Sequence, residues 1–277
     1  MKCAWKELLG ILPQWMRNDV DKLGRESLQE LRLRINSPPE LCLETGHQWL
    51  CERICADDLN FVINTASRYS PWAAVTISKG YLTAPGGHRI GICGTAVIKQ
   101  EIITGIRDIS SLCIRIARDF TEIGDNVAHV SGSVLILGAP GWGKTTLLRD
   151  LIRKRSEKEC ICVIDERGEL FPSGFQRGKQ MDVFNGVPKP IGIDMVLRTM
   201  GPSAIAVDEI TAEADCMALL HAANCGVHLL ATAHASSYED FLKRRIYSPL
   251  TNCHVFDYLI VLHPDRSYHI ERMRICK

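Results

Sequence analysis

Residues 138–146, which read GAPGWGKTT, constrain the fold of this chain more than any other stretch. They match the pattern G-x-x-x-x-G-K-[ST], follow the apolar run SVLILG and precede a segment whose leucines share one helical face. A strand, a glycine-rich turn and a helix in this order bring backbone N–H groups and a helix N-terminus to one point, where an anion is stabilised. The stretch therefore predicts a phosphate-binding loop at the carboxyl end of a strand.

The side chains of this loop have separate predicted tasks. We expect Lys144 to meet the β- and γ-phosphates of a nucleotide and Thr145 to hold Mg²⁺ through its hydroxyl, so ATP and Mg²⁺ are the expected cofactors. The predicted nucleotide-binding set is Gly138, Ala139, Pro140, Gly141, Trp142, Gly143, Lys144, Thr145 and Thr146.

Three further apolar runs end in residues that carry chemistry. AIAVDE ends in Asp208 and Glu209, at the strand end where open α/β sheets bind ligands. We expect Asp208 to coordinate Mg²⁺ and Glu209 to orient and deprotonate the attacking water. VIDERGEL places Asp165 and Glu166, and LLATAHA places His234, at comparable points. The alternative is that these are solvated acids at helix starts and a satisfied histidine.

The pattern changes near residue 126. Residues 1–125 mix helical periods with alternating strands, at 28–35 and 112–119 for example, and predict a smaller α+β domain. Residues 126–277 alternate short apolar strands with helices, which predicts an α/β domain with a mostly parallel sheet. Its expected strands are 133–138, 160–165, 204–207, 227–233 and 258–262. The polar segment 120–133 is interpreted as a hinge.

Composition excludes several classes of protein. The chain has 33 Lys+Arg against 32 Asp+Glu, so no global field attracts nucleic acid, and none is expected as a partner. No apolar run reaches the ~18–20 residues that cross a bilayer, so no transmembrane segment is expected. An amphipathic segment between Trp5 and Met16 either packs on its own domain or docks on a membrane or partner.

The 12 cysteines are interpreted as reduced thiols, because a cytosolic nucleotide-binding chain of this length needs no disulfide framework. Cys51 and Cys55, or Cys160 and Cys162, are spaced like metal ligands but lack a matched second pair. A structural zinc site is therefore the minor alternative.

Taken in order, GAPGWGKT, VIDERGE, AIAVDE and ATAHA resemble the phosphate loop, Asp box, Walker B strand and His box of the ATPases of type II and type IV secretion systems and type IV pili. Closer still is the similarity to the stage III sporulation protein AA family of endospore-forming bacteria. That similarity is carried by ELRLRINSPPEL, GGHRIGICGTAV, IRIARD and MDVFNGVPKPIGIDMVLRTMGPSAIAVDEIT.

The resemblance implies a RecA-like P-loop ATPase domain, preceded by the smaller α+β domain. It also implies homo-hexameric rings that hydrolyse Mg-ATP and power or assemble a channel between mother cell and forespore. Membrane proteins of that channel would be the partners. The expected location is cytoplasmic and peripheral to the inner face of the membrane, on the mother-cell side.

Family members lend arginines from the N-terminal domain to the nucleotide site, and the resemblance makes Arg89, Arg115 and Arg118 the candidates here. A plain surface charge on a strand is the alternative for Arg118. Thr211 stands where the sporulation family is expected to have glycine.

Two departures concern the catalytic acid. Secretion ATPases usually carry glycine at the position of Asp208, and their Asp box begins Glu-Asp, whereas this chain has Asp165-Glu166. The choice of the catalytic acid between these two residues and Glu209 therefore stays open.

Two other functions remain as alternatives. One is a non-hydrolysing switch or scaffold, in which ATP only fixes the domain arrangement. The other is a nucleic-acid-linked RecA-like ATPase, favoured by the basic clusters LKRRIY and IRKRS. These clusters lack interleaved aromatic residues and are interpreted as solvated helix faces.

Overall fold

A computed structural model describes residues 1–68, 76–127 and 129–273 of the chain. The run FVINTASRYS, residues 61–70, predicts a helix by its apolar spacing. This helix is observed as α3 (Ala56–Ala66), and residues 69–70 lie outside the described part. The helix begins earlier than predicted because the Asp58 carboxylate accepts a hydrogen bond from the Cys55 N–H at 2.9 Å and caps the first turn.

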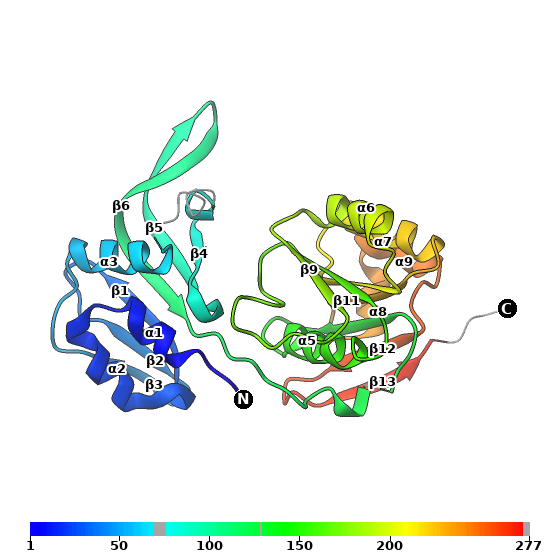
Figure 1. Ribbon diagram of the computed structural model, residues 1–277, viewed down its shortest axis with the longest axis horizontal. Helices are drawn as coiled ribbons and strands as arrows, with labels where there is room; N and C mark the ends of the chain where they lie inside the picture. Colours follow the sequence, from blue (N-terminus) through cyan, green and yellow to red (C-terminus); the bar gives the residue numbers. More distant parts are fainter. Residues whose placement is uncertain (69–75, 128, 274–277) are drawn as a thin grey trace. The chain divides into compact units, whose positions relative to one another are not determined.

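The chain divides into two compact units (Figure 1). Unit 1 comprises Met1–Asp119 and Pro172–Phe175, and unit 2 comprises Phe120–Phe171 and Gln176–Lys277.

The division falls at 119–120, whereas the sequence suggested 125–126. Asp119 stays with unit 1 because its backbone N–H and C=O both pair with Lys2 at 2.8 Å. Gly124 belongs to unit 2 because its N–H donates to the buried Asp150 carboxylate, also at 2.8 Å.

Unit 1 is a six-stranded antiparallel sheet with helices on one face. Its elements are α1 (Trp5–Ile11), α2 (Gln14–Ser27), β1 (Leu28–Arg34), β2 (Glu40–Leu43), β3 (Gly46–Trp49), α3 (Ala56–Ala66), β4 (Tyr81–Thr83), the 3₁₀ turn η1 (Pro85–Gly87), β5 (Arg89–Lys99) and β6 (Ile102–Arg115). The strand order is β3-β2-β1-β6-β5-β4.

The core of unit 1 lies between the helices and the inner face of this sheet. Leu31 and Leu33 of β1 alternate with exposed arginines, as predicted, and are fully buried. Leu8, Leu12 and Met16 from the amphipathic N-terminal segment are equally buried in the same cluster. That segment therefore packs on its own unit.

The hairpin of β5 and β6 extends beyond the rest of unit 1 (Figure 1). Gln100 and Glu101 form its turn with φ of 49° and 63°, the left-handed pair that a tight hairpin requires. Ile98, Ile102 and Ile103 beside the turn are exposed. Glycines within β5 interrupt the alternation typical of a strand, so the length of this hairpin was not predicted from the sequence.

Unit 2 contains a seven-stranded sheet, in which only β13 is antiparallel to its neighbour. Its strands are β7 (Val134–Gly138), β8 (Ile161–Asp165), β9 (Met181–Asn185), β10 (Ala204–Glu209), β11 (His228–His234), β12 (Tyr258–Leu262) and β13 (Tyr268–Arg272). The order is β13-β12-β7-β11-β10-β8-β9, so the chain crosses over between strands, and the predicted mostly parallel sheet is confirmed.

Helices cover both faces of this sheet (Figure 1). They are α5 (Lys144–Arg155), α6 (Lys189–Thr199), α7 (Glu213–Asn224), α8 (Tyr238–Lys243) and α9 (Ser248–Asn252), with 3₁₀ turns η2 (Asp125–Val127) and η3 (Arg245–Tyr247). The α5 side packs on one set of alternating strand residues, and α6, α7, α8 and α9 pack on the other.

Helix α5 is buried on nearly every side, although the sequence predicted one apolar face. The side chains of Arg153 and Asp150 are 8% and 1% exposed and form an ion pair at 2.7 Å. Arg155 is also buried and donates to the Gly132 carbonyl at 2.6 Å. The interpretation of IRKRS as a solvated helix face is therefore wrong, because two of its cations are internal.

The prediction of a hinge over residues 120–133 is also wrong for the second half of that segment. Val127 and Val130 are buried in the unit 2 core, and the Ser133 N–H donates to the Asp257 carboxylate at 2.7 Å. Ser133 and these two valines therefore pack as part of unit 2.

Within the described ranges, no helix has the length and apolar character needed to cross a bilayer.

His88 is a fully buried histidine in unit 1. Its Nδ1 accepts from the Ala117 N–H at 3.2 Å, so Nε2 carries the ring proton and donates to the Ala4 carbonyl at 3.0 Å. Burial lowers the pKa of this imidazole below its ordinary value of 6.5. The neutral ring therefore ties the N-terminus to the end of β6.

We expect the free energy of unfolding to fall as the pH drops below about 6.5, because unfolded His88 then takes up a proton that folded His88 does not. Urea unfolding between pH 5.5 and 7.5 measures this loss, and NMR titration of the ring gives its folded midpoint. A His88→Gln variant keeps a donor for the Ala4 carbonyl and should lose this part of the pH dependence. A folded midpoint at or above 6.5 would contradict the assignment.

Candidate functional site

The glycine-rich loop follows β7 directly and leads into α5, as the sequence predicts. Gly143 has φ of 100°, a left-handed conformation that side chains rarely adopt. A Cβ on Gly138 would lie 3.3 Å from the Lys144 Cγ, so glycine there leaves room for the lysine stem. The two glycines therefore set the turn and the path of Lys144.

The Lys144 ammonium is nearly buried and uses all three of its protons. Its Nζ lies 2.9 Å from the Gly138 carbonyl oxygen, 3.1 Å from the Ala139 carbonyl oxygen and 2.7 Å from the His234 Nδ1. Burial lowers the pKa of Lys144, and the nearby Glu209 and Asp208 carboxylates act in the opposite direction. The ammonium group therefore has neutral hydrogen-bond acceptors as its direct partners, and two carboxylates lie nearby.

Asp208 lies at the carboxyl end of β10 beside the start of α5. The Thr145 hydroxyl donates to its Oδ1 at 3.2 Å, which joins the two predicted metal ligands. Burial raises the pKa of the Asp208 carboxyl, and the charge of Asp165 raises it further. Thr232 of β11 donates to the Asp208 backbone carbonyl at 2.8 Å and fixes this end of the strand.

His234 connects the phosphate loop to Glu209. It is the register partner of Gly138, because β11 pairs in parallel with β7. Since the Lys144 ammonium can only donate, His234 Nδ1 accepts and Nε2 carries the ring proton. Nε2 lies 2.7 Å from the Glu209 Oε1 and donates to it. Lys144, His234 and Glu209 therefore form one continuous hydrogen-bonded chain, which we call the relay.

Asp165 is fully buried at the end of β8. Its carboxylate accepts from the backbone N–H groups of Glu169, Leu170 and Phe171 at 2.8, 2.9 and 3.0 Å. Burial raises the pKa of this carboxyl, and the hydrogen bonds from Phe171 and Leu170 together with the Arg149 charge oppose the rise. In this structure the carboxylate organises the following loop, and its predicted catalytic role stays a prediction.

Lys189 belongs to this site although the sequence did not predict it. Its side chain is 5% exposed, and its Nζ lies 2.8 Å from Glu166 Oε2 and 4.0 Å from Asp215 Oδ2. Asp215 in turn accepts from the N–H groups of Thr211 and Ala212 before α7. Lys189 thus lies between an acid of the turn after β8 and an acid of the first turn of α7. A cation at the first residue of a helix is unfavourable beside the positive end of the helix dipole. The position of Lys189 at the start of α6 was therefore the feature of the sequence that could have indicated a special role.

The predicted arginines lie in unit 1 and have partners there. The Arg118 guanidinium donates to the carbonyls of Arg25, Glu26 and Leu28, at 2.7 Å for the last. Arg115 is exposed and lies 3.4 Å from Glu30. Their role toward a nucleotide stays a prediction.

Arg89 is the third of these arginines, and its guanidinium lies 4.9 Å from the centroid of the Tyr81 ring.

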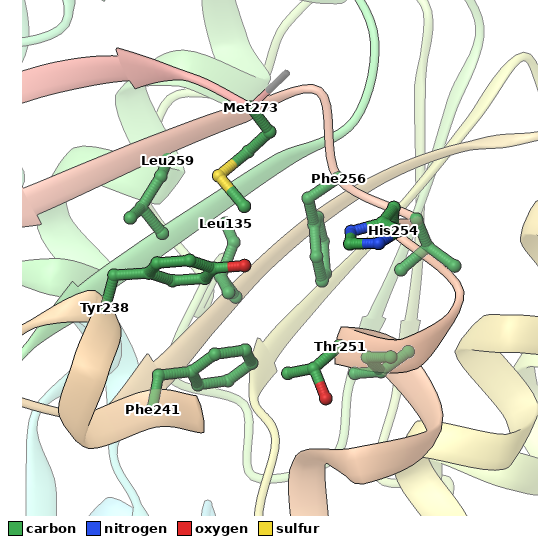
Figure 2. Close-up of a pocket in the computed structure, with 10 residues that line it drawn as sticks. Leu135, Tyr238, Phe241, Thr251, His254, Phe256, Leu259 and Met273 are labelled. Atoms are coloured by element: carbon green, nitrogen blue, oxygen red, sulfur yellow. The ribbon is translucent and has the colours of Figure 1, made fainter. Parts of the chain in front are cut away.

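A separate apolar pocket is lined by α8, α9 and the neighbouring strands (Figure 2). The rings of Tyr238, Phe241 and Phe256 and the side chains of Leu259 and Met273 border it. These groups offer little to bind a phosphate. None of the residues predicted from the sequence to bind nucleotide or metal lines this pocket.

The sequence profile of the family described as "Sporulation stage III, protein AA" matches residues 6–270. Stage III sporulation protein AA of Bacillus subtilis (strain 168) is 34% identical over 272 residues, which cover 91% of this chain and 88% of that protein. The protein SEEDLING PLASTID DEVELOPMENT 1 of Arabidopsis thaliana is 26% identical over 248 residues, which cover 85% of this chain and 34% of that protein.

Two solved structures share the fold. The Legionella pneumophila ATPase DotB superposes with a TM-score of 0.61 at 20% identity, over 94% of this chain and 80% of that one. The pilus retraction motor PilT, solved with bound ADP, superposes with a TM-score of 0.66 at 13% identity, over 94% of this chain and 83% of that one. These matches confirm the predicted secretion-ATPase, RecA-like fold.

The profile match extends from the first helix to the last strand, and it includes the glycine-rich loop and the three strand ends that meet it. The chain therefore belongs to the sporulation stage III protein AA family.

Proposed function

We propose that this chain is a P-loop ATPase that hydrolyses Mg-ATP and powers or assembles an envelope channel during endospore formation. The observation that carries the proposal is the relay, which links the loop lysine to a carboxylate on the adjoining strands. PilT, which shares the fold, is a pilus retraction motor that binds ADP, and this supports a nucleotide-driven role.

The phosphate loop and Lys144 would hold the polyphosphate of ATP. Mg²⁺ fits the neighbouring pair, because Thr145 and Asp208 offer a hydroxyl and a carboxylate oxygen 3.2 Å apart, which are the hard ligands that this ion prefers. When bound there, Mg²⁺ would supply Lewis-acid stabilisation of charge on the phosphates.

Glu209 is the best-placed general base. Its side chain is 25% exposed, so water reaches it, and the His234 N–H orients its carboxylate. Asp165 is enclosed by backbone donors, and Glu166 is paired with Lys189. In the proposed mechanism Glu209 therefore takes the proton from the attacking water, and His234 positions both Glu209 and Lys144.

The sporulation channel, the hexamer and a location at the inner membrane face are proposed from the family. A ring would let a neighbouring subunit supply an arginine such as Arg115, since closed symmetry places one surface of each copy against another of the next. Membrane proteins of the channel would then be the partners of the assembled ring.

Lys144→Ala should abolish ATP binding, because the loop would lose the cation that faces its interior. Glu209→Gln should retain ATP binding and reduce turnover by about 10²- to 10⁴-fold, the usual contribution of a general base. Phosphate release and nucleotide binding of the purified chain measure the two effects.

The exposed residues Lys158 and Glu157 provide matched controls, as Lys158→Ala and Glu157→Gln. Undiminished turnover in both site variants would remove the assigned mechanism. Tight ATP binding without any phosphate release by the parent chain would favour the switch or scaffold. Stimulation of turnover by single-stranded DNA would favour the nucleic-acid alternative.

Asp165→Asn should destabilise unit 2 by about 1–3 kcal/mol, because the new amide N–H₂ would face backbone donors in place of an acceptor. Urea unfolding measures the change, with Asp182→Asn on an exposed part of β9 as the control. Loss of turnover with unchanged stability would instead make Asp165 a catalytic acid.

The Glu209→Gln variant should assemble into a hexamer in the presence of Mg-ATP, since it would hold the nucleotide without consuming it. Mass measurement with and without Mg-ATP tests this expectation. A strict monomer in every condition would contradict the ring.

A further inference from the structure

The outer face of the unit 1 sheet carries three different potential metal ligands near one edge. Cys42 of β2 is the register partner of His47 of β3. Glu40 lies two residues before Cys42 and so points to the same face, while Leu41 between them is buried in the core. The pleat of two paired strands therefore brings a carboxylate, a thiol and an imidazole together.

The ligand atoms are close enough for one ion. One oxygen of Glu40, the Sγ of Cys42 and one ring nitrogen of His47 all lie within 4.8 Å of one another. Bonds of ~2.0–2.3 Å in a tetrahedral zinc site separate its ligands by roughly 3.3–3.8 Å. Small side-chain rotations would therefore be enough to close the three atoms around a cation.

Neighbouring side chains already orient two of the three ligands. Arg34 Nη1 holds Glu40 Oε2 at 2.6 Å, while the other oxygen, Oε1, faces the His47 Nδ1 at 2.8 Å. The His47 ring stacks on Trp49 with centroids 6.2 Å apart. Support of this kind, from groups that do not bind the ion, is typical of metal sites.

The set of ligands indicates the kind of metal. A thiolate, an imidazole and a carboxylate suit Zn²⁺, whereas Mg²⁺ and Ca²⁺ prefer oxygen ligands alone. Burial raises the pKa of the half-buried Cys42 thiol, and the charges of Glu40 and Glu30 raise it further. Zinc binding must therefore displace the thiol proton, which passes to solvent.

We propose that Glu40, Cys42 and His47 form a Zn²⁺ site with one position open to water. The site would attach β3 to the sheet more firmly. All four residues of this edge strand are exposed, so β3 has little apolar packing of its own. The proposal concerns unit 1 alone and is independent of nucleotide hydrolysis.

The test is a titration of the full, chelator-treated and reduced chain with Co²⁺, followed by competition with Zn²⁺. We expect one Co²⁺ per chain, a thiolate-to-cobalt charge-transfer band in the near ultraviolet, and loss of that band when Zn²⁺ displaces Co²⁺. Cys42→Ser should remove the band. His47→Gln and Glu40→Gln should weaken Zn²⁺ binding by at least about tenfold.

Cys51→Ser, Cys55→Ser and Cys93→Ser are the matched controls, because these thiols are exposed and lie outside the cluster. They should keep both the band and the affinity. His47 is itself exposed, so its variant should fold normally, and circular dichroism checks this. The proposal is overturned if the parent chain binds Zn²⁺ no more tightly than Cys42→Ser, or if the band depends on Cys51 or Cys55.

Discussion

The parallel pairing of β7 with β11 is the constraint on which the site depends. It makes His234 the neighbour of Gly138, and the adjoining β10 then brings Glu209 beside the same histidine. Parallel strands have their carboxyl ends at the same edge of the sheet, so residues that are far apart in the sequence meet there. A shift of two residues between β7 and β11 would break the hydrogen bond between Lys144 and His234.

Unit 2 also contains ion pairs that involve buried side chains. Asp150 with Arg153, and Lys189 with Glu166, are ion pairs in which at least one partner is almost fully buried. Removing one partner of such a pair costs more than the pair contributes, because the other charge remains desolvated. The first pair lies within α5, and the second joins the start of α6 to the turn after β8.

The sequence predicted the parallel sheet and the residues at its strand ends, because apolar runs followed by polar residues specify both at once. It could not predict the partners of Lys189, which depend on how α6, the turn after β8 and the start of α7 approach one another in space. The buried arginines of α5 were misjudged for the same reason, since periodicity assigns charge to solvent and cannot detect an internal acid. The short strands β2 and β3 have no marked pattern, so the Glu40–Cys42–His47 cluster follows only from their pairing.

The three hydrogen bonds of the Lys144 ammonium affect which anions the proposed site would bind. An anion entering the loop must draw this group away from two carbonyl oxygens and an imidazole nitrogen, so its net affinity is what remains after three existing hydrogen bonds are replaced. A lone orthophosphate offers few oxygens in return, whereas a polyphosphate chain reaches the helix N-terminus and the lysine together. In the proposed nucleotide site, these three hydrogen bonds would therefore favour a polyphosphate over a single phosphate.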